Sequence, residues 1–143
     1  MKSFLLCAGV GAIGAGIASL FGGWDHAVVT LLIFMAIDYV TGLVVAGIFH
    51  RSPKTENGAL ESKAGLKGLF RKGGILLVVL IAVRLDLLIG TNFVRDAVVI
   101  AFVVNEVLSI IENLGLMGVP IPKPLIDAIE LLRKKTESEE KKE

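Results

Sequence analysis

Four apolar runs most constrain what this chain can fold into: residues 3–21, 27–49, 73–90 and 93–112. Each run is close to the roughly 20 residues that an α-helix needs to cross about 30 Å of hydrocarbon. Hydrophobic residues make up 54% of the 143 positions, which is more apolar surface than a soluble domain of this size can bury. The sequence therefore predicts an all-α, polytopic membrane protein with four transmembrane helices.

The charge of the loops predicts the orientation of these helices. Residues 50–72 hold six Lys or Arg against two Glu, whereas the connections at 21–26 and 90–92 hold no Lys or Arg. Because cytoplasmic loops are enriched in basic residues, we expect residues 50–72 on the cytoplasmic side. Four crossings then place both termini in the cytoplasm.

The basic residues at the end of this loop also suggest a contact with lipid. They are Lys63, Lys67, Arg71 and Lys72, and the first three recur at helical spacing. This pattern favours a short basic helix that rests on anionic headgroups. The alternative is that these residues only determine the topology.

A cluster of prolines ends the fourth apolar run. The sequence "GVPIPKP" (118–124) stops a helix. Residues 124–135 then place apolar side chains at helical period, which predicts an amphipathic helix. We therefore expect three parts: a four-helix transmembrane domain (1–119), a proline break with an amphipathic cytoplasmic helix (120–135) and a charged, disordered tail (136–143).

Two opposite charges fall deep inside the second and third runs. Asp38 lies 11 residues from Phe49 and Arg84 lies 11 residues from Gly73, so each is roughly 16 Å from the cytoplasmic end of its run. Since the two runs are antiparallel, we expect an intramembrane Asp38–Arg84 pair. The alternative is that each charge separately faces water or backbone carbonyls.

The fourth run carries polar side chains on one face. At 100° per residue they fall within about 120° of arc. They are Asn105, Glu106, Ser109, Glu112 and Asn113, and Arg95 falls on the same stripe. Facing lipid would cost this stripe too much free energy. Two interpretations remain: the stripe bonds helices together, or it lines water once several copies assemble.

Small residues on two runs predict close helix packing. The first run carries Ala8, Ala12 and Gly16 at four-residue spacing, and the second run carries Thr41 and Gly42. Small residues at this spacing let helix backbones approach closely in membranes. The pattern does not distinguish packing within one chain from packing between chains.

No arrangement of residues in the sequence indicates catalysis. There is no phosphate-binding loop, dinucleotide-binding motif or Ser-His-Asp set. His26 and His50 fall on opposite sides of the membrane, and the basic loop is too small to suggest a nucleic-acid interface. We therefore expect no catalytic residue, no metal, no cofactor and no nucleic-acid partner, and hence no enzyme.

Five segments, taken in order, resemble a known family. They are "DYVTG" (38–42), "SKAGLKGLFRK" (62–72), "RLD" (84–86), "NEVLSIIEN" (105–113) and "GVPIPKPL" (118–125). Their order and spacing resemble the phage holin family associated with toxin secretion and phage lysis. The resemblance covers roughly residues 30–133, and the residues before 30 carry little of it.

The resemblance implies a small protein that accumulates in the bacterial cytoplasmic membrane, forms homo-oligomers and permeabilises the membrane at a set time. An endolysin, or in some relatives a toxin, then passes as cargo. The residues that match the pattern are Asp38, Thr41, Gly42, Asn105, Glu106, Ser109, Glu112, Asn113 and Pro120. The alternatives are a membrane scaffold without transport, or a small ion-coupled transporter or channel in which Asp38 or Glu106 binds a proton or a cation.

Overall fold

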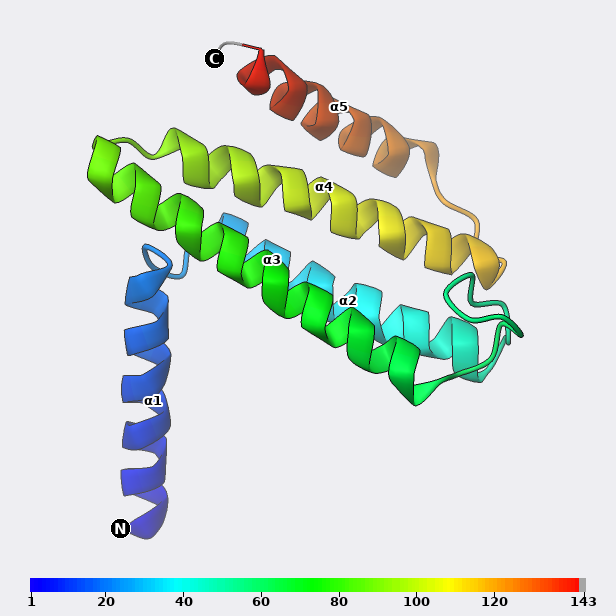
Figure 1. The fold of residues 1–143 in the computed structure, drawn as a ribbon, viewed down its shortest axis with the longest axis horizontal. Helices are drawn as coiled ribbons and strands as arrows, with labels where there is room; N and C mark the ends of the chain where they lie inside the picture. The colour runs from blue at the N-terminus through cyan, green and yellow to red at the C-terminus, as the bar shows by residue number, and fades with distance from the viewer. Residues whose placement is uncertain (142–143) are drawn as a thin grey trace.

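The apolar runs form long helices, most of which lie beside one another. The computed structural model describes residues 1–141, and within this part of the chain every regular element is an α-helix (Figure 1). The helices are α1 (Lys2–Leu20), α2 (His26–Gly47), α3 (Ser62–Ile89), α4 (Phe93–Leu116) and α5 (Lys123–Glu140). The prediction of an all-α fold is confirmed.

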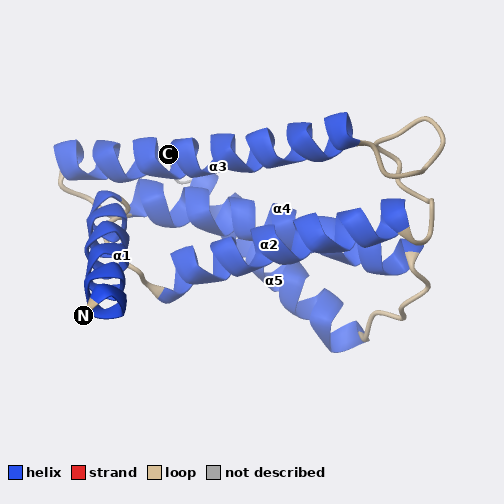
Figure 2. Ribbon diagram, turned by 90° about the horizontal axis from the view of Figure 1, so that it is seen from below, coloured by secondary structure: helices blue, strands red, loops and turns tan. Residues whose placement is uncertain are grey.

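Three helices, α2, α3 and α4, form a bundle in which α4 packs against both of the others (Figure 2). The bundle core consists of buried aliphatic side chains from all three helices: Val28, Leu31, Met35, Ile75, Val79, Val99 and Val103. In a membrane, such contacts contribute mainly through close packing, because lipid tails are as apolar as the side chains. This core fixes the register in which polar side chains on the three helices meet.

A short turn joins α3 to α4 as an antiparallel hairpin. Gly90 adopts a left-handed conformation with φ +80°, which favours glycine. The N–H groups of Gly90 and Thr91 both donate to the carbonyl of Asp86, at 2.7 and 3.0 Å, and so close the end of α3. The short connection expected at residues 90–92 is confirmed.

The third helix is longer than the sequence suggests. It begins at Ser62 and continues through Gly73 and Gly74 to Ile89, because two glycines lower helix propensity without blocking a helix that packs against neighbours. The basic helix expected within 50–72 is therefore the first part of α3 and not a separate element.

Three helices, α1, α2 and α4, are long and apolar enough to cross a membrane. The third helix, α3, falls outside this group because its last 18 residues include Lys72, Arg84 and Asp86. By length and composition, the structure therefore gives three candidate spans where the sequence predicts four.

The first helix points away from the bundle, at a steep angle to the other helices (Figure 1). Nearly all of its side chains are exposed, and Ala18 is its buried residue. A helix of 19 residues with so many exposed apolar side chains needs lipid or another protein surface around it.

The last helix, α5, runs back along α4 (Figure 1). It continues to Glu140, five residues into the segment expected to be disordered. Two side-chain contacts accompany this extension: Arg133 Nε donates to Glu137 Oε1 at 3.1 Å, and Thr136 Oγ1 donates to the Leu132 carbonyl at 3.1 Å. Residues 142–143 of the expected tail lie outside the described part of the chain.

Candidate functional site

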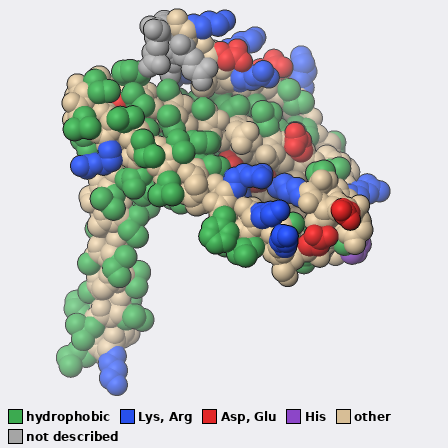
Figure 3. Space-filling model, in the orientation of Figure 1, with side chains coloured by type: hydrophobic (Ala, Val, Ile, Leu, Met, Phe, Trp, Pro, Cys, Tyr) green, Lys and Arg blue, Asp and Glu red, His purple; other side chains and the backbone are tan. Residues whose placement is uncertain are grey.

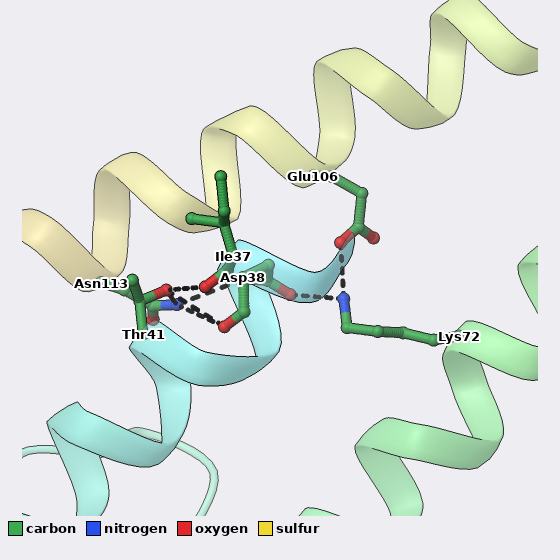
Figure 4. A network of polar contacts seen from close by, with 6 residues as sticks. All are labelled: Ile37, Asp38, Thr41, Lys72, Glu106 and Asn113. Atoms are coloured by element: carbon green, nitrogen blue, oxygen red, sulfur yellow. Dashed lines mark hydrogen bonds and ion pairs between the residues drawn. The ribbon is translucent and has the colours of Figure 1, made fainter. Parts of the chain in front are cut away.

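A connected set of polar side chains lies between the three bundle helices, and we call it the Lys72 network. It comprises Asp38 and Thr41 of α2, Lys72 of α3, and Glu106 and Asn113 of α4 (Figure 4). Each helix thus contributes at least one side chain, so the network ties the bundle together inside its apolar surroundings.

The charged half of the network is centred on the Lys72 ammonium. Its Nζ donates to Asp38 Oδ2 at 2.7 Å and to Glu106 Oε2 at 2.5 Å. One cation therefore bridges a carboxylate from α2 and a carboxylate from α4 (Figure 4).

The neutral half of the network is centred on the Asn113 amide. Its Nδ2 lies 2.9 Å from Thr41 Oγ1 and 3.2 Å from both Asp38 Oδ1 and the Asp38 carbonyl. The hydroxyl of Thr41 in turn lies within bonding distance of the Ile37 carbonyl at 2.8 Å. Asp38 therefore receives hydrogen bonds from α3 on one carboxylate oxygen and from α4 on the other.

The charged side chains of the network are deeply buried. The side chains of Lys72, Asp38 and Glu106 are 13%, 8% and 4% exposed. Removing an ion from water costs several kcal/mol unless a partner and hydrogen bonds compensate. The two carboxylates therefore depend on the ammonium, because loss of Lys72 leaves both of them buried without a cation.

The expected Asp38–Arg84 pair is wrong. Asp38 pairs with Lys72, while Arg84 is exposed and has no ion-pair partner among the described residues. The predicted depth of Arg84 takes Gly73 as the start of the helix, but α3 begins eleven residues earlier, at Ser62. Lys72 is ten residues from the start of α3 and Asp38 is nine residues from the end of α2, so both lie roughly 14–15 Å from the loop.

The polar stripe predicted on α4 divides into two edges. Arg95, Glu106 and Asn113 are buried, Ser109 is partly buried, and Asn105 and Glu112 are exposed. At 100° per residue the three buried residues lie within about 20° of one line along the helix. This line faces α2 and α3, whereas Asn105 and Glu112 form an outward edge. The buried line bonds helices together, which agrees with the first interpretation of the stripe. The outward edge has no such contact within the single chain.

A second polar cluster lies at the opposite end of the bundle, around Arg95. Its Nη1 donates to Asp25 Oδ2 at 2.6 Å and to Asp96 Oδ1 at 3.2 Å, and its Nε donates to the Phe21 carbonyl at 3.1 Å. We call Asp25, Asp86, Arg95 and Asp96 the Arg95 cluster. The guanidinium thereby connects α4 to the turn between α1 and α2.

Asp86 holds the first turn of α4. Its carboxylate accepts hydrogen bonds from the backbone N–H groups of Arg95 at 2.7 Å and Val94 at 3.2 Å, and from the Thr91 hydroxyl at 2.7 Å. The first N–H groups of a helix lack partners within the helix. Asp86 of α3 is the acceptor for two of these N–H groups. A side chain from the end of α3 therefore holds the turn between α3 and α4.

Asp25 caps the start of α2 and belongs to the Arg95 cluster as well. It accepts from the Val28 N–H at 2.9 Å, as N-cap residues do. The hydrogen bond from the Arg95 side chain, together with this backbone N–H, holds the pKa of the Asp25 carboxyl below its ordinary value of 3.8.

A small cavity of about 50 Å³ reaches the Lys72 network from the loop between α2 and α3. Its lining includes Asp38 and Asn113 at one end and residues 52–55 at the other. Beside it, the Tyr39 hydroxyl donates to the Gly65 carbonyl at 3.3 Å. A cavity of this size has room for a few water molecules, and Asp38 and Asn113 offer them polar partners at its inner end, so the network has a route to the loop side.

The small residues predicted to pack helices have different surroundings. Thr41 belongs to the Lys72 network, and a Cβ at Gly42 would lie 3.8 Å from Asn113 Nδ2, so α4 approaches α2 closely at this point. The residues of α1, namely Ala8, Ala12 and Gly16, are exposed, and a Cβ at Gly16 would meet no atom within 4 Å.

The chemistry that these clusters offer is ion pairing and hydrogen bonding. Within residues 1–141, no group of three or more His, Cys, Asp and Glu side chains is arranged to hold a metal ion. Cys7 is exposed on α1.

The role of Lys72 escapes the sequence analysis, which assigns it to the basic loop with Lys63, Lys67 and Arg71. A signal for it exists in the sequence. Lys72 is on the same helical line as the buried residues Ile75, Val79, Val83 and Asp86, at intervals of three, seven, eleven and fourteen residues. Extending the helical period back across the two glycines would have placed Lys72 on the buried face.

Comparison with known proteins gives a consistent result over most of the chain. The bacteriophage holin family matches residues 15–134. An uncharacterized 14.9 kDa protein in the nagH 3′ region of Clostridium perfringens is 37% identical over 129 residues, which are 89% of this chain and 92% of the relative.

Two further relatives extend this comparison. The uncharacterized protein Lin0175 of Listeria innocua is 38% identical and covers 96% of this chain and 94% of its own length. A probable holin of Bacillus phage phi105 is 31% identical over 114 residues, which are 79% of this chain and 78% of that protein. No solved structure matches the chain significantly. From the match over residues 15–134 and these relatives, the chain belongs to the bacteriophage holin family.

Proposed function

We propose that this protein is a holin that oligomerises in the bacterial cytoplasmic membrane and permeabilises it, so that an endolysin or a toxin leaves the cell. The observation that carries the proposal is the Lys72 network. Its ion pairs join three apolar helices in a chain that belongs to the holin family. A buried network of this kind can hold helices in one arrangement and exchange its partners in another.

The proposed membrane placement has four crossings, by α1, α2, α3 and α4, with both termini in the cytoplasm. The pairing of Lys72 supports a crossing by α3, because its charge is compensated by Asp38 and Glu106 within the bundle. Arg84 lies five residues from the end of α3, about 8 Å along the helix, so its long side chain can reach the outer surface.

Two surfaces that the single chain leaves unused support self-association. One is α1, which is exposed and carries small residues at four-residue spacing. The other is the outward edge of α4, where Asn105 and Glu112 are exposed. A polar edge in hydrocarbon requires either a partner helix or water. Assembly into homo-oligomers would supply one or both.

We place α5 at the cytoplasmic surface as an amphipathic helix. Its charged side chains, among them Arg133, Lys134 and Lys135, are exposed, and such side chains are costly in lipid. Its apolar residue Ile129 is buried against the bundle in the single chain. Pro120 and Pro122 end the helical path between α4 and α5, so α5 is a separate helix that can leave α4 for the membrane surface.

The mechanism we propose is a shift between two populations. In the resting state the Lys72 network is satisfied within one chain. In the assembled state the outward edge of α4 faces water between copies, and the network re-pairs. The step requires no catalysis, because it exchanges hydrogen-bond and ion-pair partners.

Timed induction in cells tests this function. We expect abrupt growth arrest and release of a cytosolic reporter enzyme at a reproducible time after induction. Glu106→Gln alters the Lys72 network and Asn105→Leu alters the outward edge, so both should shift that time. Unchanged timing in both variants, at equal membrane abundance, would show that the polar residues of α4 do not control permeabilisation.

A small ion-coupled transporter or channel is the second candidate function. The cavity that reaches Asp38 from the loop side favours it, because a buried carboxylate with a water route is suited to binding a proton or a cation. This function predicts graded flux of small ions without release of a protein-sized reporter.

A further inference from the structure

The first turns of α3 and the preceding loop form a groove lined by basic side chains. Its charged lining consists of Lys54, Lys63, Lys67 and Arg71, with Glu61 as the opposing charge, and its volume is about 440 Å³. Four cations against one carboxylate give this groove a formal charge of +3. We call it the basic groove.

The depth of the basic groove follows from the Lys72–Asp38 pair. This pair sets α3 against α2, and Asp38 is nine residues before the end of α2, which is roughly 14 Å. Arg71 is adjacent to Lys72 but faces outward. It therefore lies at about the depth of Asp38, and Lys67 and Lys63 lie successively about 6 Å closer to the cytoplasm.

Apolar side chains flank the basic groove on the exposed surface of α3. Leu66, Leu69 and Phe70 are 54%, 55% and 74% exposed. In the space-filling view, Lys and Arg side chains gather beside hydrophobic ones at this end of the bundle (Figure 3). A row of cations next to exposed apolar groups matches an amphiphile that has an anionic headgroup and acyl chains.

We propose that the basic groove binds anionic phospholipid, and that the headgroup phosphate follows Lys63, Lys67 and Arg71 below the level of the surrounding leaflet. This inference rests on the membrane placement proposed above, but not on pore formation. Exposed cations at this depth are costly in hydrocarbon. A phosphate drawn down along α3 pairs with them and thins the inner leaflet locally, beside the helices that are proposed to assemble.

Lipid binding by the full-length protein tests this inference. In native mass spectrometry of the detergent-solubilised protein, phosphatidylglycerol should remain bound in preference to phosphatidylcholine. Each Lys or Arg near an anionic lipid contributes about fivefold in affinity. The double variant Lys67→Gln with Arg71→Gln should therefore reduce phosphatidylglycerol retention roughly 25-fold, if both contribute fully.

A matched control changes the same charge elsewhere. Lys134→Gln with Lys135→Gln, on exposed positions of α5, should reduce phosphatidylglycerol retention by no more than about fivefold, because these residues lie outside the groove and contact lipid only at the membrane surface. An equal loss in both double variants, or equal retention of the two lipids by the unaltered protein, overturns the proposal.

A third arm distinguishes lipid from a soluble anion. Inorganic phosphate, added at millimolar concentration, should not displace phosphatidylglycerol, because it lacks acyl chains to cover the exposed Leu66 and Phe70. Complete displacement would mean that the groove is a site for free phosphate and would overturn the lipid assignment. Selective lipid binding by a protein that releases no reporter from cells would leave this inference standing and contradict only the proposed function.

Discussion

The two polar clusters of the bundle both compensate a buried cation with carboxylates, but the carboxylates differ in their exposure to solvent. In the Lys72 network one ammonium serves two carboxylates that are 8% and 4% exposed. In the Arg95 cluster a guanidinium that is 11% exposed serves two carboxylates that are 49% and 55% exposed. The first cluster must be satisfied by protein on every side, whereas the partners of Arg95 also have access to solvent.

The difference shows which cluster determines helix packing. The planar guanidinium of Arg95 donates to a backbone carbonyl and to two carboxylates. Water can replace much of this hydrogen bonding if the side chain is removed. Lys72 is a point charge between two helices, and nothing else among the described residues compensates Asp38 and Glu106 with positive charge. The Lys72 network should therefore be the more sensitive of the two.

Removal of the Lys72 charge should give the largest loss. In Lys72→Met the carboxylates of Asp38 and Glu106 remain buried without a cation, which costs about 3–5 kcal/mol. Thermal unfolding of the detergent-solubilised protein measures this loss. Lys67→Met, on the exposed face of α3, is the matched control and should change stability by less than about 0.5 kcal/mol. Similar losses in the two variants would contradict the comparison.

Removal of both carboxylate charges should cost more than the sum of the single changes. Asp38→Asn and Glu106→Gln each leave Lys72 with one carboxylate, and each should cost roughly 1 kcal/mol. The double variant leaves a buried ammonium unpaired, so we expect a coupling energy of about 0.5–3 kcal/mol in a double-mutant cycle. Additive losses would show that Lys72 does not bridge the two carboxylates.

Removal of the Arg95 side chain should have a moderate effect. Arg95→Met loses three hydrogen bonds, but its partners are partly hydrated, so we expect a loss of about 1–2 kcal/mol. The matched control is Arg84→Met, which is exposed and has no ion-pair partner among the described residues. A loss as large as that of Lys72→Met would mean that solvent access does not distinguish the clusters.

Acidification should have the smallest effect and should act through Asp25. Because the pKa of Asp25 is below 3.8 in the folded protein, the unfolded state binds a proton first as the pH falls. The stabilisation is therefore complete above pH 3.8 and is lost as the pH falls through the lower, folded pKa. Since Asp25 is half exposed, the contribution should be under about 1 kcal/mol.

The comparison of unfolding temperatures for the unaltered protein and Asp25→Asn measures this contribution. The difference between the two proteins should shrink as the pH drops below 3.8. High salt should also reduce the difference, because an exposed ion pair is screened. A difference that is constant across this pH range would assign the effect to capping of α2 alone.

The sequence predicts the helices better than it predicts their contacts. Apolar length and period place α1, α2 and α4 within a few residues, and Gly90 marks the turn before α4. The start of α3 escapes prediction because the basic residues before Gly73 suggest a loop. That one boundary moves the register by eleven residues and replaces the expected Arg84 with Lys72 as the partner of Asp38.

The division of the α4 stripe also escapes prediction. Helical period places Asn105, Glu106 and Asn113 on one broad face, but it cannot say where α2 and α3 lie relative to that face. The core side chains Val99 and Val103 settle this, because they turn Glu106 inward and leave Asn105 exposed. The position of a neighbouring helix depends on side-chain packing, which the helical periodicity of the sequence does not specify.

Leakage from liposomes measures permeabilisation by the protein alone. The purified protein, reconstituted at increasing density, should at a threshold density release encapsulated solutes from ion to protein size together. Glu106→Gln should shift this threshold, because it alters the Lys72 network, while Lys134→Gln should not. Release confined to small ions at every density, with no dependence on Glu106, would contradict a holin function for this protein.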